Sequence, residues 1–158
     1  MKKQIFFALV LSLTFLASCN RELSEINITS LPTPITTYIA INYPGYHLDE
    51  AQKDTLCNGT AGIEVELEKK GAEDISLFFN NENVFVLKEA EIKYRDLPTA
   101  VQSYITTNYP NFKLPEEADK ITLANNTIQY EVDIKEKTTK IEKEIVINSD
   151  GTSKICAR

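Results

Sequence analysis

The sequence is poor in the residues that build most catalytic and cofactor sites. It contains no Trp, one His and five Gly in 158 residues. With a single His, we expect neither a zinc site built from a histidine cluster nor a His-dependent catalytic triad. No phosphate-binding glycine loop, G-x-S-x-G or H-E-x-x-H motif occurs. We therefore expect a protein that is not an enzyme, and the remaining alternative is a small hydrolase with an unrecognised site.

Basic residues are also scarce relative to acidic ones. The chain has 17 Lys and Arg against 23 Asp and Glu, a formal net charge of −6. No basic stripe offsets this balance, and an acidic protein repels phosphate backbones, so we do not expect nucleic acid as a partner. Apolar and charged contents are ordinary for a globular protein. The length provides for one domain or for two small units that share a core.

The first twenty residues, MKKQIFFALVLSLTFLASCN, have the pattern of an export signal. Two lysines precede an apolar run at residues 5–16, which is shorter than the about 20 residues that cross a bilayer. The run ends in LASC at residues 16–19, which resembles a bacterial lipobox. This resemblance implies cleavage before Cys19 and attachment of fatty acyl chains such as palmitate to Cys19, which anchor the protein without spanning the membrane. The alternative is a soluble export signal with an accidental Cys.

One stretch of the sequence occurs twice. LPTPITTYIAINYP at residues 31–44 returns as LPTAVQSYITTNYP at residues 97–110, and IEVEL at 63–67 returns as YEVDI at 130–134. Two copies of one supersecondary unit are the simplest explanation. The predicted organisation is a signal peptide at residues 1–18, a lipidated Cys and tether at 19–27, a first repeat at 28–95 and a second repeat at 96–158.

Each copy is predicted to begin with a helix and to continue as a sheet. Thr33 and Thr99 are candidate helix N-caps, and Pro44 and Pro110 require that both helices end before them. Apolar and charged residues alternate in the later part of each copy, which is typical of strands with one buried face. Turn signals indicate about four strands per copy. The predicted fold class is α+β, with two tandem repeats, each one helix packed on a roughly four-stranded antiparallel sheet whose other face is open.

A lipoprotein signal followed by tandem copies of a helix ending in NYP, a YEV-like strand and a polar hairpin resembles the exported bacterial PepSY-like proteins. These proteins are related in architecture to the β-lactamase inhibitory protein. The resemblance covers roughly residues 28–158 and implies an α+β repeat whose sheet faces join and bind a protein. PepSY-type domains are proposed to restrain peptidases, although no residue here matches an inhibitory motif.

The sheet face opposite the helices is the candidate site. If Ile75, Leu77 and Phe79 point into the core, Phe78 between them lies on the open face, and Val146 does so in the second copy. Apolar groups ringed by charge are typical of a protein-binding patch, and a solvated sheet face is the alternative. The predicted partner-binding face consists of Glu64, Glu66, Phe78, Glu131, Asp133 and Val146.

The predicted function is a lipid-anchored binding module of the cell envelope. We expect a monomer that binds an unknown envelope protein and inhibits a peptidase through this face, with no cofactor. We expect contact with the membrane through the lipid anchor only. Asn20 after the Cys indicates that the protein is anchored in the outer membrane and faces the periplasm. The alternative is a Ca²⁺-responsive envelope protein, because acidic pairs recur at residues 49–50 and 116–117, although the EF-hand spacing is absent.

Two cysteines remain once Cys19 is assigned to lipid. An even number in an oxidising compartment favours a disulfide between Cys57 and Cys156. Their Cα atoms must then lie within about 7 Å of each other. This distance requires the last strand to return beside the first strand of the first copy. Two buried free thiols are the alternative.

Overall fold

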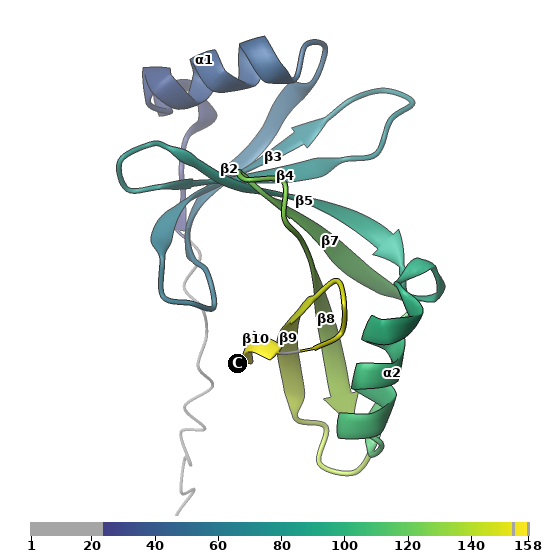
Figure 1. Cartoon of the computed structure of the whole chain (residues 1–158). Helices are drawn as coiled ribbons and strands as arrows, with labels where there is room; N and C mark the ends of the chain where they lie inside the picture. Colours follow the sequence, from purple (N-terminus) through teal and green to yellow (C-terminus); the bar gives the residue numbers. More distant parts are fainter. Residues whose placement is uncertain (1–23, 153, 158) are drawn as a thin grey trace, which may run out of the picture.

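The computed structural model describes residues 24–152 and 154–157, the last four as backbone alone. Antiparallel strands form one continuous, bent sheet, and two helices lie against its outer side (Figure 1). The predicted signal peptide and Cys19 lie outside the described residues. Within the described part, none of the helices has the length and apolar character needed to cross a membrane.

The two copies contribute matching sets of elements. The first contains β1 (Ser24–Glu25), a 3₁₀ turn (Ile28–Ser30), α1 (Thr33–Asn42), β2 (His47–Thr55), β3 (Ala61–Glu68), β4 (Ile75–Asn80) and β5 (Phe85–Lys93). The second contains a 3₁₀ turn (Tyr94–Asp96), α2 (Thr99–Asn108), β6 (Phe112–Lys113), β7 (Glu117–Leu123), β8 (Ile128–Glu136), β9 (Glu142–Asn148) and β10 (Lys154–Ala157). The sheet order is β1-β2-β3-β4-β5-β7-β8-β9-β10, with β6 paired to β8. The prediction of a helix and four main strands per copy is confirmed, and the pairing of β5 with β7 joins the copies.

Both helices end before the proline of the NYP motif, as predicted, with the tyrosine as the C-cap residue. The N–H groups of Tyr43 and Tyr109 donate to carbonyl oxygens four residues earlier, and the prolines that follow cannot continue the helix. The predicted N-caps are wrong by one position. Thr33 and Thr99 are the first helical residues, and each cap is the preceding proline, which makes no side-chain cap hydrogen bond. The proline ring already fixes φ where the chain turns into the helix.

Each helix buries an apolar stripe against its own half of the sheet. Ile35 and Ile39 of α1 are 0% and 5% exposed, and Val101 and Ile105 of α2 are fully buried. The sheet side of the first core includes Val65, Leu67, Ile75, Leu77 and Phe79. The sheet side of the second includes Tyr130, Val132, Ile134, Ile145 and Ile147. The strand faces assigned to the core by alternation are therefore confirmed.

The inner face of the sheet is not open throughout, which corrects the prediction for Phe78 and Val146. These side chains are 2% and 6% exposed and form a third apolar cluster with Leu87 and Ile121. The turn between β2 and β3 covers this cluster, since its residues Leu56 and Cys57 pack against it. Alternation placed Phe78 and Val146 on the correct face, but it contains no information about sheet curvature or about a turn folding over that face.

Gly62 on β3 makes room for the ring of Phe78. A Cβ atom at Gly62 would overlap the backbone carbonyl oxygen of Phe79 and lie 2.8 Å from Cε1 and Cζ of the Phe78 ring, closer than these atoms pack. The glycine therefore permits the aromatic ring to lie directly against the neighbouring strand.

The turn between β2 and β3 and the turn between β7 and β8 are built alike. In LCNGT (residues 56–60) the Asn58 Oδ1 atom accepts a hydrogen bond of 2.9 Å from the backbone N–H of Thr60. In LANNT (residues 123–127) the Asn125 Oδ1 atom accepts one of 3.0 Å from that of Thr127. The repeat thus extends to individual side-chain contacts.

The last strand does not take the predicted place. β10 pairs with β9, with Cys156 opposite Val146, at the other end of the sheet order from β2. The curvature of the sheet, rather than strand pairing, brings the two ends together, because Cys57 packs against the cluster that contains Val146. Cys57 is disulfide-bonded. The Cys156 side chain lies outside the described part, so the pairing of Cys57 with Cys156 stays a prediction.

Candidate functional site: an acidic groove on the inner sheet face

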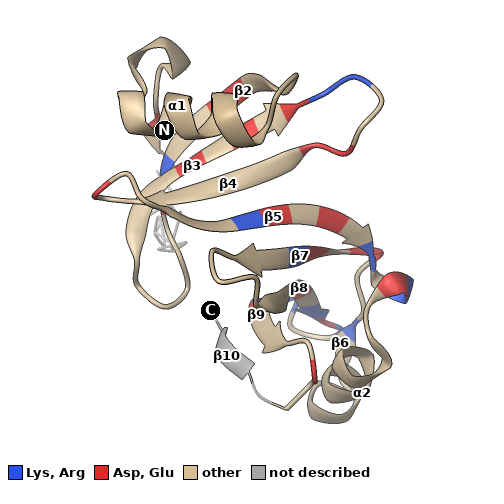
Figure 2. Ribbon diagram, turned by 45° about the horizontal axis from the view of Figure 1, so that its top comes forward, with Lys and Arg blue, Asp and Glu red and all other residues tan. Residues whose placement is uncertain are grey.

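A groove of about 370 Å³ crosses the inner face of the sheet. Figure 2 shows acidic residues recurring along β3 and β5, two strands of this sheet. None of the described residues that line the groove is a Lys, Arg or His. We call it the acidic groove, and its ten carboxylate residues are Asp54, Glu64, Glu66, Glu68, Asp74, Glu89, Glu91, Asp119, Glu131 and Glu144.

Strand alternation explains why the groove is acidic although the strands also contain lysines. Lys53, Lys88 and Lys120 are the register partners of Ile63, Leu77 and Tyr130, which all pack in the cores under the helices. Directly opposed residues lie on the same face of a sheet, so these lysines lie on the outer face. These three lysines therefore lie outside the bend, and the carboxylates of the groove lie inside it.

Three carboxylates lie in one row across the joint between the copies. Glu91 on β5 is the register partner of Asp119 on β7, and Asp119 is the partner of Glu131 on β8. On the neighbouring row, Asp133 lies opposite Glu144 of β9. Like charges directly opposite one another destabilise a strand pair. The row therefore has a free-energy cost that a bound cation would reduce.

The half-buried carboxyl groups of this row have raised pKa values. Burial, followed by the charges of Glu144 and Glu89, raises the pKa of Glu131 to about 8. Burial, followed by the charge of Glu91, raises the pKa of Asp119 to about 6. Burial also raises the pKa of Glu66 in the first copy. Near neutral pH Glu131 is thus mostly protonated, and a cation entering the groove would displace that proton.

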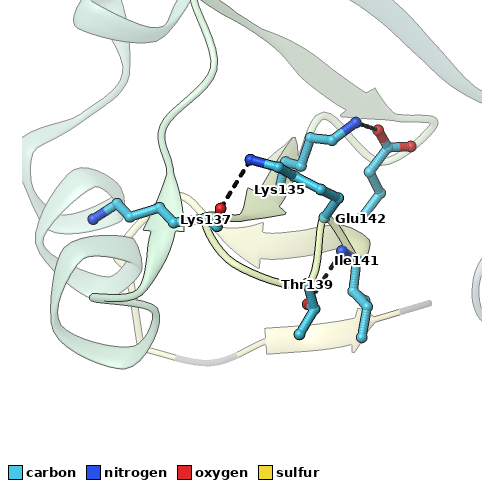
Figure 3. Close-up of polar contacts among 6 residues, drawn as sticks. Lys135, Lys137, Thr139, Ile141 and Glu142 are labelled. Atoms are coloured by element: carbon cyan, nitrogen blue, oxygen red, sulfur yellow. Dashed lines mark hydrogen bonds and ion pairs between the residues drawn. The ribbon is translucent and has the colours of Figure 1, made fainter.

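One end of the inner face has ordinary charge pairing. Lys135 on β8 lies opposite Glu142 on β9 and donates a hydrogen bond to its carboxylate (Figure 3). This bond lowers the pKa of Glu142. At the hairpin tip beyond, the backbone N–H of Ile141 donates to Thr139 Oγ1 at 3.4 Å. The acidic groove therefore ends where Lys135 supplies an opposite charge.

Three carboxylates at this end of the groove lie close enough to share one ion. Glu131, Asp133 and Glu144 each have an oxygen within 4.8 Å of the others. Carboxylate oxygens are the ligands that Ca²⁺ prefers, and Ca²⁺ takes six to eight oxygens in flexible geometry. Three carboxylates would leave part of such a shell to water or to a partner.

An apolar pocket of about 140 Å³ adjoins the acidic groove. Its floor contains the buried side chains of Leu87, Ile121 and Val146, and its rim contains the half-buried Leu56, Val86 and Leu123. Glu89 and Glu131 line both the pocket and the groove. The inner face thus places an apolar hollow and a carboxylate-rich hollow side by side with a shared wall.

The structure brings the six predicted face residues onto one face. Glu64, Glu66, Phe78 and Glu131 line the acidic groove, Asp133 adjoins it, and Val146 lines the apolar pocket. The predicted face omitted seven of the ten acidic residues of the groove, namely Asp54, Glu68, Asp74, Glu89, Glu91, Asp119 and Glu144. The alternating acids of KEAEIK at residues 88–93 indicate a strand with one acidic face. Only the pairing of β5 with β7 shows that this face belongs to the groove. Partner binding by this face stays a prediction.

Solved structures of three Bacteroides proteins share this fold. A DUF2874 family protein from Bacteroides uniformis is 14% identical, with a TM-score of 0.60 over 81% of this chain and 88% of that one. A protein from Bacteroides eggerthii, described as "putative periplasmic proteins", is 11% identical, with a TM-score of 0.59 over 80% of this chain and 87% of that one. A BLIP-like protein from Bacteroides fragilis is 16% identical, with a TM-score of 0.52 over 81% and 86%. At these identities the likeness concerns the fold alone.

A family comparison agrees with the tandem architecture. The family described as "Putative beta-lactamase-inhibitor-like, PepSY-like" matches twice, at residues 17–87 and 84–153. No curated protein matches the chain. The two family matches cover most of its length and confirm the resemblance found in the sequence. The chain therefore belongs to the PepSY-like family.

Proposed function

We propose that this protein is a binding module of the cell envelope that takes a positively charged segment of a partner protein into its acidic groove. The observation that carries the proposal is the row of Glu91, Asp119 and Glu131 in direct register across three strands. Repulsion within such a row decreases when a Lys or Arg side chain enters between the carboxylates.

A protein is the partner class that the family favours. The family description is beta-lactamase-inhibitor-like, and a BLIP-like protein has the same fold. A groove of about 370 Å³ that opens on a sheet face has room for side chains of an extended segment. A peptidase with a basic loop fits this description, and occupation of that loop would restrain the enzyme.

The proposed location is the outer membrane, with the module facing the periplasm. The lipobox-like residues 16–19 support lipid attachment at Cys19. The related fold from Bacteroides eggerthii is described as periplasmic. Acyl chains on Cys19 would keep the groove near the membrane surface, where envelope proteins are its candidate partners.

A charged peptide tests the groove directly. The probe is a labelled nine-residue peptide with Lys at positions 1, 3, 7 and 9 and Gly elsewhere, titrated into the full chain in mild detergent. We expect binding that weakens with added salt and strengthens as the pH rises from 6 to 8.5, because deprotonation of Glu131 and Asp119 increases the negative charge.

Charge-neutral variants locate the site of that peptide. Glu131→Gln or Asp119→Asn should weaken binding at pH 8.5 by about threefold to tenfold. The matched control is Glu82→Gln, because Glu82 is exposed in the turn between β4 and β5 and does not line the groove. The proposal fails if the peptide does not bind, or if Glu82→Gln weakens binding as much as the groove variants do.

Calcium binding is the second candidate function, and the cluster of Glu131, Asp133 and Glu144 favours it. If these carboxylates hold Ca²⁺, millimolar CaCl₂ should raise the melting temperature of the full chain, and MgCl₂ should do so less. Asp133→Asn should abolish the Ca²⁺ effect, whereas Glu82→Gln should preserve it. Equal shifts with both salts in all variants would exclude a specific Ca²⁺ site.

A further inference from the structure

The apolar pocket differs from the rest of the inner face because its floor is already part of the protein core. Leu87, Ile121 and Val146 are 5%, 3% and 6% exposed and belong to the third apolar cluster. The pocket opens above them between Leu56, Val86 and Leu123, which are half-buried. A cavity of about 150 Å³ is known to take one benzene-sized group, so a pocket of about 140 Å³ has room for one apolar side chain.

Strand register places a carboxylate next to each of two floor residues. Glu89 on β5 lies directly opposite Ile121 on β7, and Glu131 on β8 lies directly opposite Val146 on β9. Directly opposed side chains have Cβ atoms about 4.5–5.5 Å apart. A group that packs on Ile121 and Val146 therefore has the carboxylates of Glu89 and Glu131 on the neighbouring strands.

A purely apolar ligand would leave these acidic walls without any gain from charge, and a purely cationic ligand would leave the pocket unfilled. In an extended segment, residues two positions apart point the same way and lie about 6.6 Å from each other. An apolar residue in the pocket with a Lys or Arg two positions away would place its cationic neighbour at the wall formed by Glu89 or Glu131.

We propose that the segment bound by the inner face carries an apolar anchor side chain and a basic residue two positions away. The anchor lies in the apolar pocket, and the basic residue lies at the shared wall of Glu89 and Glu131. This inference rests on the proposed function and specifies its partner. The occupant is an extended segment of a basic protein, and the alternation of apolar and cationic side chains is its recognition signal.

The test compares three labelled peptides of equal length on the full chain in mild detergent. The first is the peptide with Lys at positions 1, 3, 7 and 9 and Gly elsewhere. The second has Leu in place of the central Gly, at position 5. The third keeps this Leu and replaces every Lys with Gln. We expect the second peptide to bind about tenfold more tightly than the first, from burial of one Leu side chain, and the third to bind most weakly.

A matched pair of valines tests whether this gain arises in the pocket. Val86 lines the pocket, whereas Val84, two residues earlier, is 58% exposed in the turn and does not line it. Val86→Ser should reduce the gain from Leu to about twofold or less, and Val84→Ser should retain it. Gln129→Phe provides a second test that fills the pocket from β8, and it should remove the gain while the first peptide still binds.

The outcomes separate this inference from the function on which it rests. If the first peptide binds in a salt-dependent manner but Leu adds nothing, the acidic groove binds cations and the anchor is refuted. The anchor is also refuted if Val84→Ser removes the gain as Val86→Ser does, or if the third peptide binds as tightly as the second. If the first and second peptides both fail to bind, the proposed function itself is wrong.

Discussion

The carboxyl group of Asp119 on β7 lies opposite that of Glu131 on β8, because these residues are direct partners in the antiparallel register. Opposed positions on a sheet are where proteins place complementary pairs, as this one does with Lys135 and Glu142. The acidic pair, half-buried inside the bend, makes the sheet sensitive both to protons and to cationic ligands.

Stability should therefore decrease as the pH rises from 6 to 8.5. The pKa of Glu131 is raised from 4.5 to about 8 in the folded protein, so the folded state holds a proton that the unfolded state has released. The stabilisation from this bound proton is fully present below about pH 4.5 and is lost as the pH rises through about 8. Asp119 likewise lowers the stability as the pH rises from 3.8 to about 6, because its pKa is raised over that range. Urea unfolding at pH 6, 7 and 8.5 measures this slope.

Glu131→Gln should remove most of the dependence of the unfolding free energy on pH and stabilise the protein at pH 8.5. We expect a gain of about 1–2 kcal/mol, because partial solvation of the groove weakens the repulsion that is removed. Glu82→Gln, in an exposed turn, should leave the slope unchanged. A wild-type protein that becomes more stable between pH 6 and 8.5 would contradict the assignment of the proton to Glu131.

Phe78→Ser should destabilise the protein like a core truncation, by about 3–5 kcal/mol. Phe78 is 2% exposed and packs with Leu87, Ile121 and Val146. The control is Ile41→Ser on α1, whose side chain is 72% exposed, and it should change the unfolding free energy by less than about 0.5 kcal/mol. Similar small effects of both substitutions would mean that the third cluster contributes little to stability.

The repeat made the helices and the strand faces predictable, because alternation in each copy assigns Phe79 and Ile147 to the core without any tertiary information. The burial of Phe78 could not be predicted in this way, since it depends on sheet curvature and on the turn at residues 56–60. Likewise, Glu91 and Asp119 are far apart along the chain. Only the pairing of β5 with β7 makes them neighbours, and a strand partner across a repeat boundary cannot be derived from local periodicity.

The predicted disulfide between Cys57 and Cys156 can be checked by mass spectrometry of non-reduced, alkylated protein. We expect one peptide pair linked through these two cysteines, because Cys57 is disulfide-bonded and packs near Val146, the register partner of Cys156. By the loop-entropy model, reduction should cost about 4 kcal/mol of unfolding free energy or less. Recovery of both cysteines in alkylated form would refute the pairing.

The lipid anchor is tested by Cys19→Ala. A lipobox needs its cysteine thiol for acylation, so the variant should leave the membrane fraction or accumulate with its signal uncleaved. Cell fractionation with immunoblotting measures both outcomes. Asn20→Ala, next to the acylation site, should leave acylation intact and serves as a control. Unchanged membrane partition and processing of Cys19→Ala would show that the anchor is elsewhere.

The joint between β5 and β7 has a consequence for how such a surface arises. β5 is the last strand of the first copy and β7 is the first main strand of the second, so Glu91 comes from one copy while Asp119 and Glu131 come from the other. A solitary copy would hold no complete carboxylate row. The row therefore depends on the junction of the two copies, and substitutions in either half can retune it while the other half keeps its own core.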